Sequence, residues 1–210
     1  MSFAYPVMLD LAGRDCLVVG GGAVAERKIE GLLAADARVT VVSPWLSAAL
    51  LALAREARLH WRPCEYTVGD AAGFVLVMVA SSDRSVNAAV AAECRERGIW
   101  VNCADDPVHC DFILPSVFRR GALTVAVSTG GVSPTMARLV REELEARLPD
   151  DVAPLTDVMA DVRRSLQERG ISVNAERWSQ ALDAELRSLA AAGRTSEAQA
   201  RLKERLGVSG

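Results

Sequence analysis

The sequence has 210 residues, of which 50% are apolar and 24% charged, a composition typical of a folded globular protein that excludes a disordered chain. The formal net charge of −3 argues against a nucleic-acid-binding protein, which needs a basic surface. Five cysteines, an odd number, indicate no disulfide framework and favour a reducing compartment. No secretory signal is recognisable, and the longest apolar run, GFVLVMVA, is far shorter than a membrane span. We therefore expect a cytoplasmic protein that does not bind a membrane.

The first part of the sequence alternates short apolar strands with helices. Such alternation predicts βαβ units and a parallel sheet covered by helices on both faces. We therefore expect a Rossmann-type α/β domain over residues 1–112. Its strands are expected at residues 16–20, 38–44, 60–66, 73–82 and 99–106, and its helices at residues 23–37, 46–59 and 83–98.

The pattern changes after Asp111. Strand-like runs at residues 113–118 and 123–128 are joined through RRGA, which predicts an antiparallel hairpin. Ser133 is expected to cap a helix that begins with Pro134. Residues 113–149 thus form a small α+β segment.

Nothing after Pro149 resembles a strand. Three helices are expected, over residues 154–170, 174–193 and 195–207, each closed by a glycine that suits a left-handed position. Asn174 and Thr195 are the expected N-caps of the last two helices. Residues 150–210 are therefore predicted to be a helical domain.

The glycine-rich turn after the first strand carries the clearest chemistry. Gly20, Gly22 and Ala25 match the G-x-G-x-x-G/A fingerprint, in which glycines allow a tight turn and a close approach of backbone to a pyrophosphate at a helix N-terminus. A merely tight strand–helix corner is the alternative, but the strand before the turn and the helix after it favour a dinucleotide. The predicted cofactor-binding residues are Gly20, Gly22, Ala23, Val24, Ser43, Pro44 and Ser81.

The acidic residue that usually binds the adenosine ribose at the end of the second strand is missing. That strand ends in Ser43 and Pro44, so a hydroxyl and backbone amides would replace a charge-assisted hydrogen bond. No arginine follows Pro44 to hold a 2′-phosphate. The sequence therefore favours NAD over NADP.

Five segments in fixed order resemble the precorrin-2 dehydrogenase / sirohydrochlorin ferrochelatase family, which includes the amino-terminal part of siroheme synthase. They are VVGGGAVAERK, VTVVSP, VASSDRSVN, VNCADDPVHCDFILPS and LTVAVSTGGVSPTMARLVREELE. The resemblance is specific over residues 1–150 and looser over the helical tail. It implies NAD-dependent oxidation of precorrin-2 to sirohydrochlorin, and a homodimer formed through the segment after the Rossmann domain. The methyltransferase domain of the fused synthase has no counterpart in this sequence, so no methylation is implied.

The resemblance places the family's essential aspartate on Asp105, in VNCADDP. Oxidation of a reduced tetrapyrrole removes a hydride and a proton, and a carboxylate suits the proton. By residue type alone, Asp105 would be read as a turn or cap residue. Some family members also insert iron, for which the same carboxylate could collect protons, so insertion of ferrous or cobaltous ion is left open.

Precorrin-2 carries many carboxylates, and local groups must hold them on this acidic chain. The predicted substrate-binding residues are Asn102, Ser128, Thr129 and Arg138. Arg119, Arg120 and Arg141 are further candidates, with a solvated face as the alternative, and for Arg141 a pair with Glu145 explains the residue equally well.

Three other interpretations are weaker. Cys103, His109 and Cys110 do not have the spacing of a metal site, so no metal is predicted, and His109 is at most a modulator. A chelatase with a vestigial nucleotide pocket would not need Gly20 and Gly22 intact. A non-catalytic NAD sensor would not need VNCADDP or the arginine-bearing helix.

Overall fold

The computed structural model describes residues 5–104 and 106–208. The chain divides into two compact units, Met1–Ile113 and Leu114–Gly210, and each is described by itself. The predicted division at residues 112 and 149 stays a prediction.

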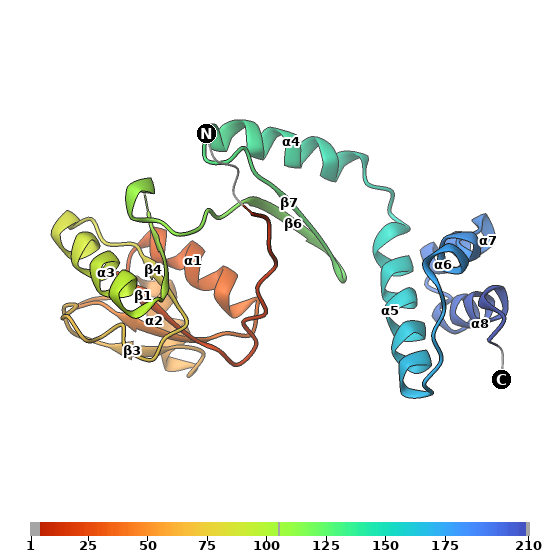
Figure 1. Cartoon of the computed structure of the whole chain (residues 1–210), viewed down its shortest axis with the longest axis horizontal. Coiled ribbons are helices and arrows are strands. Elements are labelled where there is room, and N and C mark those ends of the chain that lie inside the picture. Colours follow the sequence, from red (N-terminus) through yellow and green to blue (C-terminus); the bar gives the residue numbers. More distant parts are fainter. Residues whose placement is uncertain (1–4, 105, 209–210) are drawn as a thin grey trace. The chain divides into compact units, whose positions relative to one another are not determined.

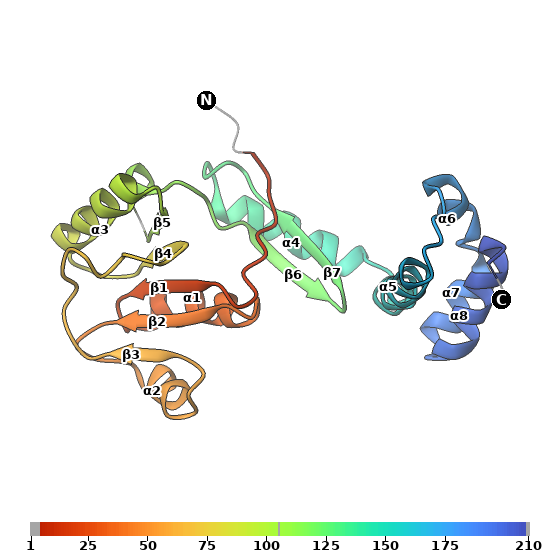
Figure 2. The same cartoon turned by 60° about the horizontal axis from the view of Figure 1, so that its bottom comes forward.

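The first unit is built on a parallel sheet of five short strands, as predicted. The strands lie in the order β3-β2-β1-β4-β5 (Figure 2). The chain moves outward from β1 in one direction and then from β4 in the other. The carboxyl ends of β1 and β4 therefore form a switch point, where such sheets bind ligands. The strands are β1 (Asp15–Val19), β2 (Arg38–Val42), β3 (His60–Arg62), β4 (Leu76–Val79) and β5 (Trp100–Cys103).

Helices cover both faces of this sheet (Figure 1). Because successive strand side chains point to opposite faces, Cys16 and Val18 of β1 pack with α1 and α2, whereas Leu17 and Val19 pack with α3. All four side chains are buried. The helices are α1 (Ala23–Leu33), α2 (Ala48–Arg55) and α3 (Arg84–Arg97).

A buried carboxylate fastens the loop between β3 and β4 to α3. Glu93 is 3% exposed and accepts hydrogen bonds from the Tyr66 hydroxyl, the Gly69 N–H at 2.8 Å and Arg97 at 2.8 Å. Burial alone would raise the pKa of Glu93, but these hydrogen bonds outweigh it and leave the pKa below its usual value. The carboxylate is thus a structural anchor.

The second unit begins with the predicted hairpin and helix. Strands β6 (Ser116–Arg120) and β7 (Leu123–Val127) pair antiparallel, and Gly121 in the turn has φ +55°. Helix α4 (Pro134–Arg147) is capped by the Ser133 hydroxyl. Arg120 donates to the carbonyls of Glu145 and Leu148 at the far end of α4, so this arginine ties the hairpin to the helix.

The rest of this unit is helical, with an apolar core of its own. Two details of the prediction are wrong. Residues 174–193 form two helices, because the Asp183 carboxylate accepts a hydrogen bond from the Leu186 N–H at 2.8 Å and starts a new helix. Thr195 is the first residue of the last helix and not its cap; Asn174 is a cap as predicted. The helices are α5 (Val152–Glu168), α6 (Ala175–Ala181), α7 (Ala184–Ala191) and α8 (Thr195–Leu206). No helix in the described part of the chain is long and apolar enough to cross a membrane.

Candidate dinucleotide-binding site

Gly20 fixes the turn at the switch point. Its N–H donates to the Val42 carbonyl of β2 at 2.9 Å, and its φ is +114°, a conformation that favours glycine. A Cβ atom here would lie 2.6 Å from the Ala80 carbonyl oxygen, just after β4. The ends of three strands therefore meet at a residue that the protein itself requires to be glycine.

Gly21, which the fingerprint does not specify, is equally constrained. A Cβ atom at Gly21 would lie 2.0 Å from the Trp45 carbonyl oxygen, and the Gly21 carbonyl accepts from the Ser47 N–H at 2.8 Å. Residues 43–47 therefore pack directly against the glycine turn. The only signal for this contact in the sequence is the third glycine in a row.

The N-terminus of α1 suits an anion. Gly22 is its N-cap and makes no side-chain cap hydrogen bond, whereas Ser47 and Asp83 cap α2 and α3. Backbone N–H groups there are left for another acceptor. Ala23 and Val24 form the first turn, and the buried Ala25 packs in the core below it.

The protein itself does not require glycine at position 22. Gly22 has φ −96°, which any residue adopts, and a Cβ atom there would meet only the Trp45 ring, at 3.4 Å. A ligand whose backbone passes close by gives a reason for the glycine that packing does not. The turn thus fits a pyrophosphate.

Both hydrogen-bond donors of Ser43, its hydroxyl and its N–H, bind other groups of the protein. Its hydroxyl donates to the Trp45 carbonyl at 2.6 Å, its N–H to the Arg62 carbonyl at 3.3 Å, and its carbonyl accepts from the Trp61 indole. Ser43 therefore has no hydrogen left to donate to a ribose and could contact one only as an acceptor, through its hydroxyl or carbonyl oxygen. Pro44 beside it has no N–H, so the predicted contacts of both residues with the cofactor stay predictions.

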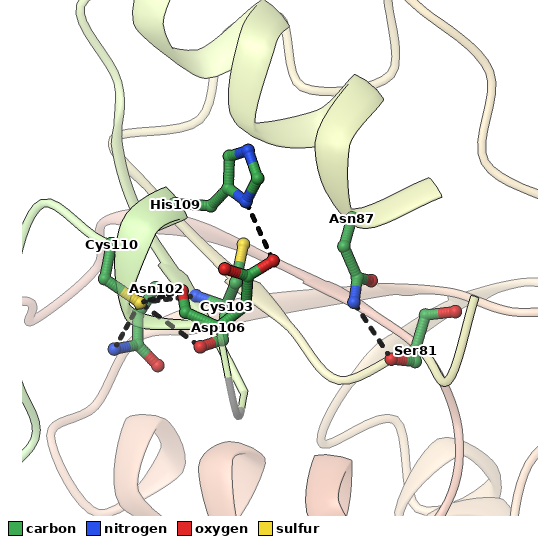
Figure 3. Close-up of polar contacts among 7 residues, drawn as sticks. All are labelled: Ser81, Asn87, Asn102, Cys103, Asp106, His109 and Cys110. Carbon is green, nitrogen blue, oxygen red and sulfur yellow. Dashed lines mark hydrogen bonds and ion pairs between the residues drawn. The ribbon is translucent and has the colours of Figure 1, made fainter. Parts of the chain in front are cut away.

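The loop after β4 completes the edge of the site. The Ser81 hydroxyl accepts from the Asp83 N–H at 3.0 Å, and the Ser81 carbonyl accepts from the buried Asn87 amide at 3.3 Å (Figure 3). Asn87 therefore holds this loop from the first turns of α3. The Asn87 amide oxygen is buried without a partner in the described chain.

The catalytic candidate Asp105 lies outside the described residues, and the strand before it, β5, ends at Cys103. Asn102 of β5 is 8% exposed. Its amide oxygen accepts from the Lys28 ammonium at 2.6 Å, and its amide nitrogen donates to the Phe112 carbonyl at 2.9 Å. Lys28 therefore bridges α1 to β5. The predicted contact of Asn102 with substrate stays a prediction.

The segment after β5 is held by a cysteine. The Cys110 sulfur accepts from the Cys103 N–H at 3.1 Å and donates to the carbonyls of Cys103 and Asp106 (Figure 3). Burial raises the pKa of the Cys103 thiol to about 12 and raises that of Cys110 as well. Both thiols are therefore protonated, structural groups. Among the described side chains, no cluster of three His, Cys, Asp or Glu residues could hold a metal ion.

His109 has a partner that the sequence did not indicate. Its Nδ1 lies 2.8 Å from an Asp106 carboxylate oxygen (Figure 3), across the 3₁₀ turn Pro107–His109. Both side chains are about 30% exposed, at 31% and 29%. The carboxylate orients the imidazole on the segment that follows Asp105.

The remaining candidates belong to the second unit. Thr129 exchanges two hydrogen bonds of 3.0 Å with the Ser133 backbone, and the Ser128 hydroxyl accepts from the Gly130 N–H, so both shape the loop before α4. Arg141 pairs with Glu145, the alternative to substrate binding that the sequence offered, and also with Glu142. Arg138 is 64% exposed, with a loose contact of 3.9 Å to Glu142, and is the more available cation.

A glycine turn, an open helix N-terminus and a parallel-sheet switch point define a dinucleotide-binding protein of the Rossmann type. The chain belongs to the putative NAD(P)-binding family, whose model matches residues 7–116. Residues 120–147 match the central region of sirohaem biosynthesis proteins. NAD, predicted from the sequence, is the cofactor that this family and the structural match below support.

Relatives and a solved structure confirm the resemblance to the siroheme family. A siroheme synthase of Methylococcus capsulatus is 39% identical over 201 residues, which cover 95% of this chain and 42% of that protein. One of Nitrosomonas europaea is 40% identical over 204 residues, 96% of this chain and 43% of that protein. The chain thus spans less than half the length of these relatives. A solved structure described as SirC, precorrin-2 dehydrogenase, superposes with a TM-score of 0.75 at 28% identity, covering 96% of this chain and 100% of that one.

Proposed function

We propose that this protein oxidises precorrin-2 to sirohydrochlorin with NAD, as a step of siroheme biosynthesis. The observation that carries the proposal is the glycine turn, in which Gly22 is free of packing constraint beside an uncapped helix N-terminus. The match, which covers 96% of this chain and the whole of a precorrin-2 dehydrogenase structure, supports the same activity.

The balance of the reaction assigns the roles. Precorrin-2 loses a hydride and a proton, and bound NAD supplies the hydride acceptor. Asp105, which follows β5, is the proposed acceptor of the proton. Lys28 and Asn102 hold the end of β5 against α1, so the glycine turn and the strand that leads to Asp105 keep a fixed spacing.

Cationic and hydroxyl groups of the second unit are proposed to bind the substrate carboxylates. Arg138 is exposed on α4, and Arg119 is exposed on β6. The loop of Ser128 and Thr129 leads directly into the N-terminus of α4, which favours an anion.

We propose that the second unit forms a homodimer. One face of α4 exposes Met136, Leu139, Val140 and Leu144, by 37 to 51%. A two-stranded sheet with one helix buries little apolar area of its own, and only Phe118 and Ala137 of this segment are buried. A second copy covering the same face would complete this core. Replacing Leu139 with glutamate is then expected to shift the dimer to monomer in light scattering.

The activity is tested by supplying anaerobic precorrin-2 and NAD to the purified chain and following NADH absorbance. The wild type is expected to form NADH, and Asp105→Asn to do so at least about a hundredfold more slowly, since general-base catalysis contributes about that much. Asp106→Asn is the matched control. An undiminished rate in Asp105→Asn removes Asp105 from the mechanism, and a wild type that forms no NADH removes the activity.

The second arm of the experiment supplies sirohydrochlorin with ferrous or cobaltous ion, in the same buffers and without NAD. Metal insertion that Asp105→Asn abolishes would assign both reactions to one carboxylate. We place the reaction in the cytoplasm, which the five free thiols support.

A further inference from the structure

Trp45 is a large exposed aromatic side chain beside the glycine turn. It is 59% exposed and follows the two residues that replace the ribose-binding acid. Its ring lies 3.4 Å from where a Cβ atom of Gly22 would stand. The indole therefore borders the space that the fingerprint leaves open for the dinucleotide.

The backbone beneath the indole is held rigidly. The Ser43 hydroxyl donates to the Trp45 carbonyl at 2.6 Å, and the same carbonyl oxygen packs against Gly21, where it leaves no room for a Cβ. The Ser47 N–H closes the segment onto the Gly21 carbonyl at 2.8 Å. The position of Trp45 is thus set by two contacts of its segment with Gly21 and by one hydrogen bond from Ser43, and its ring is not used to fill the core.

Neither the segment of Trp45 nor the end of the neighbouring strand offers an unpaired cation for a phosphorylated ribose. Arg62 ends the neighbouring strand, but its guanidinium pairs with Asp70 at 3.1 Å. Residues 43–47 contain neither lysine nor arginine. The indole N–H makes no hydrogen bond within the described chain, which leaves it able to donate to an oxygen of a ligand.

We propose that Trp45 binds the adenosine half of NAD, with its ring face on the adenine or its ribose, and so replaces the missing acidic residue. This assignment rests on the proposed cofactor. A contact with the cofactor would explain why a large aromatic side chain stays exposed just after β2. It would also explain why the Ser43 hydroxyl donates to the Trp45 carbonyl and not to a ligand.

Calorimetric titration of the full chain with NAD and with ADP-ribose, which lacks the nicotinamide, tests the role. Trp45→Ala is expected to weaken the binding of both ligands about tenfold, because stacking of an aromatic side chain on a base is worth about that much. Trp45→Phe, which keeps an aromatic face, is expected to remain within about threefold of the wild type. Trp100→Ala is the matched control, since Trp100 is 49% exposed but lies at the opposite edge of the sheet, where β5 begins.

Each outcome decides a different claim. Unchanged or tighter NAD binding by Trp45→Ala overturns the proposal, and tighter binding would show that the indole covers the phosphate site. A loss confined to NAD, with ADP-ribose unaffected, overturns it as well, because the contact would then be with the nicotinamide half. A wild type that binds neither ligand overturns the cofactor assignment itself. The side chain is exposed, so unfolding temperatures of all variants are expected to match the wild type.

Discussion

Alanine at two glycines of one turn should affect two different properties: stability at Gly20 and NAD binding at Gly22. Gly20→Ala forces a Cβ onto a residue with φ +114°, 2.6 Å from the Ala80 carbonyl oxygen. Backbone strain and overlap with a carbonyl together cost about 2–6 kcal/mol. Gly22→Ala meets nothing closer than 3.4 Å, so the free energy of unfolding should change by less than about 0.5 kcal/mol. Its methyl group nevertheless occupies the space for the pyrophosphate.

The assay must separate the two units. In a Trp178→Phe background the remaining tryptophans all lie in the first unit, so fluorescence during urea unfolding reports on that unit alone. Gly20→Ala is expected to lower the unfolding midpoint strongly. Gly22→Ala is expected to keep the midpoint and to weaken NAD binding at least about tenfold, which corresponds to about 1.4 kcal/mol.

Two results would refute this reasoning. Equal midpoints for the two variants would mean that the turn relaxes away from Ala80, so that the tight contact is not a constraint. Wild-type NAD affinity in Gly22→Ala would mean that no ligand backbone passes that glycine, and the fit of a dinucleotide to the turn would be lost.

Three further predictions concern the supports of the site and the tail. Lys28→Met leaves the buried Asn102 amide oxygen without its donor and should lower the free energy of unfolding by about 1–3 kcal/mol in urea titrations; the exposed neighbour Arg27→Met should not. Because the pKa of Glu93 is lowered in the folded state, its stabilisation is present above the pKa of the unfolded chain and lost as the pH falls through the folded-state pKa. In Glu93→Gln the free energy of unfolding should therefore fall less steeply at acid pH than in the wild type. An unchanged pH dependence would contradict the role of Glu93 as a structural anchor. Leu186→Ala, at a fully buried position, should destabilise the helical bundle by about 2–5 kcal/mol in calorimetry, with NAD affinity unchanged as the check that only the second unit is affected.

Features that depend on local pattern could be predicted from the sequence. The alternation of apolar strands with helices predicted the parallel sheet, and the caps Ser133 and Asn174 followed from residue type alone. The break at Asp183 was missed, because the run from Asn174 onward has helical propensity throughout. One carboxylate competing for the Leu186 N–H decides the boundary.

The supports of the site could not be predicted, because they join residues far apart in the chain. Lys28 and Asn102 are separated by 74 positions, and no periodicity relates a helix residue to a strand so distant. The contact of Gly21 with Trp45 likewise depends on how closely two loops approach. The fingerprint identified the turn, but the packing of residues 43–47 on it is a tertiary property.

The missing ribose acid and the exposed tryptophan have one physical explanation. Ser43 is only 4% exposed, and its hydroxyl donates to a backbone carbonyl. A carboxylate at this position would be a buried charge, which is unfavourable unless a ligand binds it. A serine carries no charge, so it does not destabilise the protein when no cofactor is bound. Its hydroxyl also holds the Trp45 carbonyl against the glycine turn. Affinity for the adenosine half then comes from an aromatic face and not from a charged group. The affinity for NAD should therefore be nearly independent of pH across the range in which carboxylates titrate, which a site built on an acidic residue would not be.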